Sequence, residues 1–295
     1  MSENRNAVDA LRPKRSLRSQ VAEFFLRKPL GATGAVILGL LIVTAIFADV
    51  VGTHERDTQD VNARLQSPSG DHYFGTDQYG RDNFTRVVHG ARVSIYVGLF
   101  SVAIGTIFGT ILGAVSAYVG GKFDLIVQRI VDAFMGFPGL ILALVLVATL
   151  GASLTNVIIA ISVVLTPRMT RLARSSSLSI RQEVYVLASQ SIGASGMRIV
   201  FRHVLPNVMA PIFVFATSYL GTAIIIEASL SFLGLGVPPP MPSWGLMLNE
   251  ATRGYFETSW WLSFFPGIAL SLVVFSFSLL GDALRDIFDP RLRGS

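Results

Sequence analysis

Hydrophobic residues dominate six stretches of this chain, and polar segments separate them. The apolar runs cover about residues 30–51, 93–119, 125–150, 156–170, 208–235 and 260–280. Most of them approach the roughly 20 apolar residues that a helix needs to cross a bilayer. Because only helices and closed barrels satisfy their own backbone in lipid, the pattern predicts an all-α, polytopic membrane protein with six transmembrane helices.

The composition supports a membrane protein and excludes other classes. The 295 residues are 51% hydrophobic and 15% charged, a combination that is rare in soluble proteins. The net charge of +5 would also fit a nucleic-acid-binding protein. That class is rejected because the basic residues gather beside apolar runs on one predicted side of the bilayer. The chain has no cysteine, so it offers no disulfide, thiolate nucleophile or Cys-based metal site.

The arginines predict which side of the membrane each polar segment occupies. They crowd the N-terminal tail, the end of the fourth apolar run and the C-terminus, whereas acidic residues offset them in the first loop. By the positive-inside rule, both termini are cytoplasmic and the first loop is extracytoplasmic. The expected division is a cytoplasmic tail with an amphipathic helix (1–28), a first transmembrane helix (29–51), an extracytoplasmic loop (52–92), a five-helix core (93–285) containing a cytoplasmic loop (173–206), and a second cytoplasmic tail (286–295).

The most strongly patterned polar segment is residues 181–207, RQEVYVLASQSIGASGMRIVFRHVLPN, which we call the elbow. Ser179 and Gln182 have the spacing of a capping box, so a helix is expected to begin there. Four apolar residues then share one helical face: Val184, Leu187, Ala188 and Ile192. The plainer alternative is an ordinary basic loop between two spans.

Glycine and proline divide the elbow into two short helices. Gly193 is expected to end the first helix, because glycine tolerates the left-handed conformation found at helix ends. Ser195 can cap a second helix, and Pro206 is expected to end it before the next apolar run. The sequence therefore predicts a helix–glycine–helix segment between two membrane spans.

The elbow resembles the cytoplasmic loop of the membrane subunits of ABC importers. The pattern of that family is Glu-Ala-Ala, three residues, Gly, nine residues, Ile, any residue, Leu-Pro. Four residues match it: Ala188, Gly193, Leu205 and Pro206. Three depart from it: Leu187 replaces the glutamate, Ser189 the second alanine and His203 the isoleucine. The resemblance implies an ATPase-coupling loop that uses Glu183, Tyr185, Ala188, Ser189, Gly193, Ala194, Arg198, His203, Leu205 and Pro206.

A second motif, HYFGTDQYGRDNFTRVVHGARVS, lies in and just after the first loop. Four of its residues could take part in metal binding or catalysis: His72, Asp77, Asp82 and His89. The favoured interpretation is structural, because Asp and Gly build turns and Arg–Asp pairs hold such a segment together. The string is similar to the Phe-Gly-Thr-Asp…Gly-Arg-Asp…Gly-Ala-Arg signature of the dipeptide, oligopeptide and nickel branch of the same importers. Because the two motifs are far apart, the resemblance covers most of the chain.

The apolar runs contain a few residues with candidate roles of their own. Gly105, Gly109 and Gly113 recur at every fourth position and predict a close helix-packing seam. Asp132 can pair with Arg129, three positions earlier on a helix. Asp132, Pro138 and Glu227 are candidate residues of the transport pathway or its gate. Glu227 is expected to face protein or a water-filled pathway, because lipid exposure of an ionisable group is costly.

The resemblance implies a permease subunit rather than an enzyme. No phosphate-binding loop occurs in the chain, so ATP and Mg²⁺ are expected on two partner ATP-binding cassette subunits, and no cofactor is expected on this chain. The other implied partners are a second homologous permease, an extracytoplasmic substrate-binding protein and the lipid bilayer, with no nucleic acid. The implied location is the bacterial inner membrane, and the implied cargo is short peptides.

Other functions remain open from sequence alone. Relatives of this type also carry nickel chelates, glutathione or opines. An ion-coupled secondary transporter could use Asp132 and Glu227 as proton sites, but it would leave the elbow without a role. A membrane enzyme is disfavoured, because the histidines fall on loops without an HExxH or Ser/His/Asp context.

Overall fold

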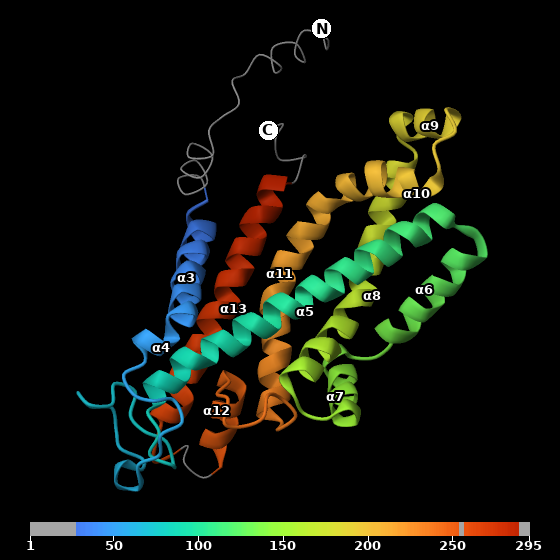
Figure 1. Ribbon diagram of the computed structural model, residues 1–295. Helices are drawn as coiled ribbons and strands as arrows, with labels where there is room; N and C mark the ends of the chain where they lie inside the picture. The colour runs from blue at the N-terminus through green and yellow to red at the C-terminus, as the bar shows by residue number, and fades with distance from the viewer. Residues whose placement is uncertain (1–27, 254–256, 289–295) are drawn as a thin grey trace.

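The computed structural model describes residues 28–253 and 257–288. The amphipathic helix expected in the N-terminal tail lies outside these residues. Within them the chain is helical and contains no β-strand. Five helices are long and apolar enough to cross a membrane, and a bent pair adds a sixth crossing when it is counted as one span (Figure 1). These features confirm the predicted all-α, polytopic membrane protein.

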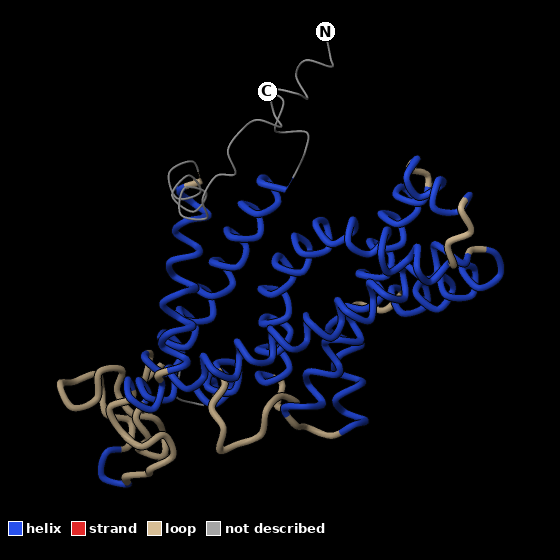
Figure 2. Tube along the Cα trace, turned by 45° about the horizontal axis from the view of Figure 1, so that its top comes forward, coloured by secondary structure: helices blue, strands red, loops and turns tan. Residues whose placement is uncertain are grey.

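The first half of the chain contributes α3 (Pro29–Ile46), α4 (Ala48–Val51), a 3-10 turn (Val61–Ala63), α5 (Asn83–Val119), α6 (Gly121–Met135) and α7 (Gly139–Leu150). The second half contributes α8 (Leu154–Arg181), α9 (Val184–Ser191), α10 (Gly196–Ile199), a π-helical turn (Val200–Val204), α11 (Leu205–Phe232), α12 (Trp244–Thr252) and α13 (Trp261–Phe288). The tube in Figure 2 shows that helices make up nearly all of the bundle, while most of the irregular chain gathers at one end.

Helices α5 and α8 pack along each other through the glycines of the expected seam. A Cβ on Gly105 would lie 3.0 Å from the carbonyl oxygen of Ser162, and one on Gly109 would lie 2.7 Å from that of Thr166. Gly113 lies still closer to α8, against the carbonyl of Thr170. The absence of side chains at these positions is what lets the two backbones approach so closely.

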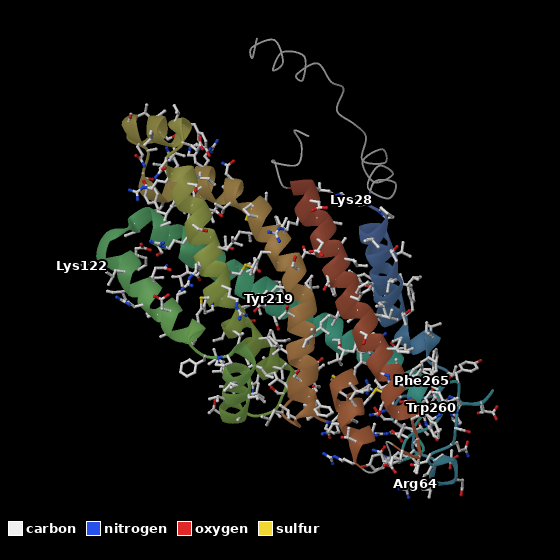
Figure 3. All side chains as sticks on the ribbon, turned by 180° about the vertical axis from the view of Figure 1, so that it is seen from behind. Lys28, Arg64, Lys122, Tyr219, Trp260 and Phe265 are labelled. Atoms are coloured by element: carbon white, nitrogen blue, oxygen red, sulfur yellow. The ribbon has the colours of Figure 1, made fainter. Side chains whose placement is uncertain are left out.

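The first span packs on the last one. A Cβ on Gly34 of α3 would lie 2.8 Å from the carbonyl oxygen of Ser276 in α13. At the end of the same pair, Nζ of Lys28 lies 2.5 Å from a carboxylate oxygen of Asp286. Figure 3 places Lys28 at one end of the bundle, Arg64 and Trp260 at the other, and Tyr219 between them.

The third apolar run is not one straight helix, which corrects the predicted span at 125–150. It is broken between Met135 and Gly139, and α6 and α7 meet at 90°. Pro138 supplies the N-cap position of α7. Proline lacks an N–H group and clashes with the preceding turn, so a helix cannot continue smoothly through it. Hydropathy alone cannot detect the break, because both pieces are apolar.

Several other boundaries also differ from those expected. Helix α5 begins at Asn83, ten residues before the predicted span, because the Asp82 side chain caps it by accepting from Thr85 N at 2.8 Å. The predicted loop of residues 52–92 therefore contains the first turns of α5. Helix α12 follows the proline-rich segment and precedes α13, where no helix was predicted. Its N-cap is Ser243, which accepts from Leu246 N at 3.3 Å.

Candidate functional site

The elbow lies at one end of the bundle, opposite the irregular first loop (Figure 1). Its first helix, α9, begins after Glu183, whose side chain forms no capping hydrogen bond. Ser179 lies inside α8, so the expected capping box is wrong. Helix α8 continues to Arg181, well beyond the predicted end of the fourth span, and carries the elbow away from the apolar part of the bundle.

The apolar face predicted for α9 points outward. Val184 is 80% exposed and Ile192 is 85% exposed, while Val186, on the other side of the helix, is completely buried. Leu187 is also exposed. Periodicity identified which residues share a face, but it could not tell which face the rest of the protein covers. The elbow thus presents an apolar tip, and exposed apolar patches of this kind mark interaction sites.

A small apolar cluster fixes the elbow to the bundle. Its buried members are Val186, Ile199, Val204 and Val208. They come from α9, α10, the π-helical turn and α11, so the whole elbow shares one core. Tyr118 of α5 and Ile180 of α8 pack against this core. The elbow is therefore in direct contact with three of the long helices, α5, α8 and α11.

Glycines set the path of the chain through the elbow. Gly193 has φ = +80° and follows the C-cap residue Ile192, in the conformation expected of a glycine that ends a helix. Gly196 lies against the Tyr118 ring, where a Cβ would be 2.6 Å from Cε1. Ser195 occupies the N-cap position of α10, but its side chain makes no capping bond.

Pro206 does not end a helix, which corrects the expectation for this residue. It is the second residue of α11, just after a π-helical turn in which the backbone hydrogen bonding is already irregular. The chain reaches it through the π-helical turn Val200–Val204, so α10 and α11 run on as one helical segment. Leu205, the other residue of the Leu-Pro match, opens α11 and packs against the elbow core.

The other predicted coupling residues spread over both elbow helices. The ring of Tyr185 lies 6.2 Å from that of His203, and the Ser189 hydroxyl donates to the Tyr185 carbonyl at 2.8 Å. Ala194 N donates to the Ser189 carbonyl at 3.1 Å and closes the turn. Three more members are exposed: Glu183, Ala188 and Arg198.

Ionic and polar contacts tie the middle and the C-terminal part of α8 to its neighbours. Arg174 binds Asp124 of α6 through two hydrogen bonds of 2.7 and 2.6 Å. Arg168 donates to the hydroxyl of Tyr219 on α11, and its guanidinium carbon lies 5.5 Å from the centre of that ring. Sequence reasoning missed these two contacts, because nothing local indicates which residues on separate helices meet.

Asp132 pairs with Arg171 of α8, which replaces the expected pairing with Arg129 three positions earlier. Both side chains of the observed pair are about half exposed. Glu227, the other candidate acid, is fully buried on α11. Its carboxylate accepts from Ser231 at 2.8 Å and from Ser94 of α5 at 3.3 Å. It therefore faces protein, one of the two environments expected of it, and lies apart from Asp132.

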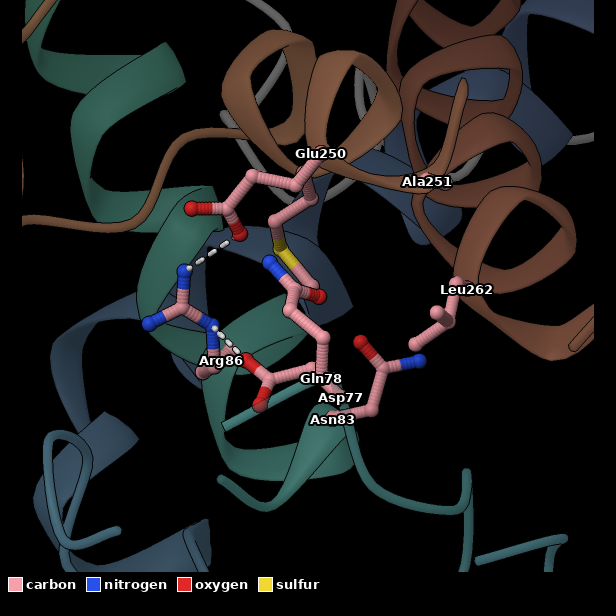
Figure 4. Close-up of a pocket in the computed structure, with 8 residues that line it drawn as sticks. Asp77, Gln78, Asn83, Arg86, Glu250, Ala251 and Leu262 are labelled. Carbon is pink, nitrogen blue, oxygen red and sulfur yellow. Dashed lines mark hydrogen bonds and ion pairs between the residues drawn. The ribbon is translucent and has the colours of Figure 1, made fainter. Parts of the chain in front are cut away.

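The four candidate residues of the first loop do not form one site. Asp77 bonds to Arg81 at 2.6 Å and lies 3.6 Å from Arg86. Both arginines also contact Glu250 of α12, Arg81 at 3.1 Å and Arg86 at 3.4 Å. Figure 4 shows Arg86 between Asp77 and Glu250. This buried ionic cluster joins the loop to α5 and α12.

The two histidines of that motif separate in the same way. His89 lies 3.8 Å from Asp49, at the end of the first span. His72 and Asp82 meet each other, together with His54. The structural interpretation of the motif therefore holds for Asp77, while the histidines take two different partners.

The fold and the elbow together define a membrane subunit of the type I permease architecture. In a solved structure of the MetNI methionine ABC transporter, described as inward facing, one chain has the same fold, with a TM-score of 0.57. The match covers 69% of this chain and 96% of the other, at 19% sequence identity. It concerns the fold alone.

Sequence comparison identifies the family. Residues 105–294 match the family described as the inner membrane component of binding-protein-dependent transport systems, and residues 16–68 match the N-terminal transmembrane domain of oligopeptide transport permease C. The chain belongs to this family of ABC importer permeases. It is 44% identical to the dipeptide transport system permease protein DppC of Alkalihalophilus pseudofirmus, over 90% of this chain and 88% of the relative.

It is also 42% identical to the glutathione transport system permease protein GsiD of Escherichia coli, over 98% of this chain and 96% of the relative. The chain is therefore a multi-pass permease subunit of a bacterial ABC importer, as the two sequence motifs predicted.

Proposed function

We propose that this chain forms, with a second homologous permease, the translocation path of an ATP-driven importer of short peptides. The observation that carries the proposal is the elbow, which combines an exposed apolar tip with a core shared by α5, α8 and α11. The names of two relatives support the cargo class. One is a dipeptide permease and the other a glutathione permease, and glutathione is itself a small peptide.

The tip of the elbow is the proposed binding site for an ATPase subunit. Val184, Leu187 and Ile192 are exposed there, and a groove on a partner protein would bury them. Full burial of one such side chain is worth about 1.5–3 kcal/mol. These few contacts can therefore supply much of the binding free energy between the elbow and an ATPase subunit. ATP and Mg²⁺ bind to two such ATPase partners in this proposal, because the chain has no phosphate-binding loop.

Movement of the elbow would pass directly into the membrane helices. Helices α8 and α11 enter and leave it, and the bond from Arg168 to Tyr219 links these two helices farther along. Closure of the ATPases would then tilt α8 and α11 together. Rocking of packed helix bundles about a central site is an established route to alternating access.

A second permease completes the proposed path. One bundle of six spans is too small to enclose a channel for a peptide. Exposed apolar residues flank the break between α6 and α7, among them Phe134, Phe137 and Ile141, and we place the partner permease against this face. The elbow end, with both termini, is cytoplasmic in this arrangement. The first loop and α12 face outward, where a substrate-binding protein delivers the peptide.

Co-purification and uptake test the proposal together. The tagged chain is extracted from its own cells in mild detergent, and its partners are identified by mass spectrometry. We expect ATPase subunits and a second permease, and ATP-dependent uptake of a labelled dipeptide after reconstitution with the binding protein. A chain that purifies without ATPases, and whose uptake follows a proton gradient, would instead be an ion-coupled carrier.

A further inference from the structure

Two histidines and one aspartate converge at the outer end of the bundle, away from the elbow. His54 follows α4, His72 lies in the first loop, and Asp82 caps α5. Nδ1 of His72 lies 2.9 Å from Oδ1 of Asp82, and Nδ1 of His54 lies 3.7 Å from the same oxygen. One ligand atom from each residue can be chosen so that all three lie within 4.8 Å of one another.

The carboxylate of Asp82 is held in place through Oδ2, and its Oδ1 faces the two histidine rings. The side chain is 1% exposed. Its other oxygen, Oδ2, accepts from Thr85 N at 2.8 Å and from the Thr85 hydroxyl at 2.7 Å. Thr53 donates to the same oxygen at 3.4 Å. Carboxylates that bind metal ions are oriented by such outer hydrogen bonds.

The two histidines are also fixed through their backbones. His54 N donates to the Thr85 hydroxyl at 3.3 Å, and His72 N donates to the Ser69 hydroxyl at 3.2 Å. The two rings stack with their centres 4.7 Å apart. Thr85 therefore orients both the carboxylate and His54, so the three residues are organised around the first turn of α5.

The distances suit a small tetrahedral ion. Zinc binds imidazole nitrogen and carboxylate oxygen at about 2.0–2.2 Å, which places neighbouring ligands roughly 3.4 Å apart. The two contacts to Oδ1, 2.9 and 3.7 Å, lie on either side of that separation. The shorter contact is a hydrogen bond with the His72 ring, and His54 Nδ1 also lies 3.0 Å from the Thr53 hydroxyl, so a bound ion would replace both bonds. The His54 side chain is 41% exposed, so its ring has room to turn toward an ion.

We propose that His54, His72 and Asp82 bind one divalent transition-metal ion, with zinc as the best match. Imidazole with carboxylate favours zinc, whereas calcium and magnesium prefer oxygen ligands alone. The protein supplies three ligands, and water completes the fourth position. The ion joins the end of the first span to the start of α5 and stabilises the outer loop, and it is separate from the peptide path.

Metal titration of the purified complex tests this site. The complex carries no polyhistidine tag, is stripped with EDTA, and is then titrated with zinc chloride or cobalt chloride. The chain has no cysteine, so none of its own thiolates competes. The variants are His72→Ala and Asp82→Asn, the second of which keeps an acceptor at the N-cap of α5. His89→Ala is the matched control, because His89 faces Asp49 instead.

We expect one zinc ion per chain, tetrahedral cobalt absorption bands, and a zinc-dependent rise in melting temperature. The two site variants should lose affinity by at least about tenfold, since even weaker outer-shell changes cost that much. The control should match the unaltered chain. Equal zinc binding by the unaltered chain and both site variants would overturn the proposal, as would failure of zinc to bind more tightly than magnesium. If His72→Ala lowers the melting temperature equally with and without zinc, the cluster is only a hydrogen-bonded one.

Discussion

Gly196 of the elbow lies directly against Tyr118 at the C-terminal end of α5, so close that a Cβ on residue 196 would be 2.6 Å from Cε1 of the ring. Tyr118 also contacts Arg181, whose guanidinium carbon lies 5.5 Å from the ring centre and whose Nη1 donates to the Ala117 carbonyl at 3.2 Å. This contact is where the elbow meets a helix that is distant from it in sequence. We therefore expect a movement of the elbow to displace α5 as well.

Gly196→Ala should weaken the transmission of movement without removing the protein from the membrane. The added methyl group must displace the Tyr118 ring, because a contact of 2.6 Å is far inside van der Waals range. We expect lower peptide uptake per ATP hydrolysed in reconstituted complex. Gly39→Ala is the matched control, since nothing lies within 4 Å of a Cβ there. Equal loss in both variants would show that the Tyr118 contact is unimportant.

Gly193→Val should impair coupling for a different reason. Space is open around Gly193, but its φ of +80° is unfavourable for a side chain. A left-handed conformation costs an ordinary residue about 1–2 kcal/mol, and a β-branched one fits it poorly. Gly193→Asn is the control, because asparagine enters this conformation more easily. Substrate-stimulated ATP hydrolysis and uptake should fall for valine and stay near normal for asparagine. Normal values for both would mean that the elbow tolerates a distorted turn.

Glu227→Gln should lower stability modestly and affect all peptides alike. Hydrogen bonds to a charged group are worth about 1.5–3 kcal/mol and neutral ones about 0.5–1.5 kcal/mol. The bonds from Ser94 and Ser231 should therefore each weaken by about 1 kcal/mol. The neutral amide costs less to bury than a charged group, which offsets part of this loss. Uptake of a peptide with a free amino terminus is compared with that of a blocked peptide, using a binding protein that accepts both. Selective loss of the free peptide would instead make Glu227 a charge-recognition site.

The sidedness of the chain can be tested because it lacks cysteine. Single cysteines at Ser67 and Ser191, both exposed, report on the first loop and on the elbow. An impermeant maleimide applied to intact cells, with the outer membrane permeabilised where one is present, should label residue 67 and not residue 191. The opposite pattern would invert the topology.

The sequence predicted the membrane class, because an apolar run of about 20 residues rarely forms anything other than a membrane-spanning helix. It also predicted a helix stop at Gly193, because that property is local to one residue. The 90° break near Pro138 was missed, although the proline was noticed, because hydropathy does not report direction. Helix α12 was missed because its N-cap, Ser243, lies directly after a proline-rich segment that indicated a loop.

Contacts between distant residues were beyond the sequence. His54 joins His72 and Asp82 only after the loop folds back on α5, and the motif that contains the last two gives no sign of His54. The exposure of Val184 and Ile192 was unpredictable for a related reason. Helical periodicity defines a face, but the covering of that face depends on the whole assembly.

The central claim is that the apolar tip of the elbow couples this chain to an ATPase, and one substitution tests it most directly. Ile192→Glu places a charge at the most exposed apolar residue of the tip, which is 85% exposed. Gln190→Glu adds the same charge at a nearby exposed residue, in the last turn of α9, without removing an apolar side chain. Substrate-stimulated ATP hydrolysis and peptide uptake are measured in reconstituted complex. The account predicts that both activities fall at least about tenfold for Ile192→Glu, a loss of about 1.4 kcal/mol or more, and stay near normal for Gln190→Glu. Normal ATP hydrolysis and uptake with Ile192→Glu would contradict the account.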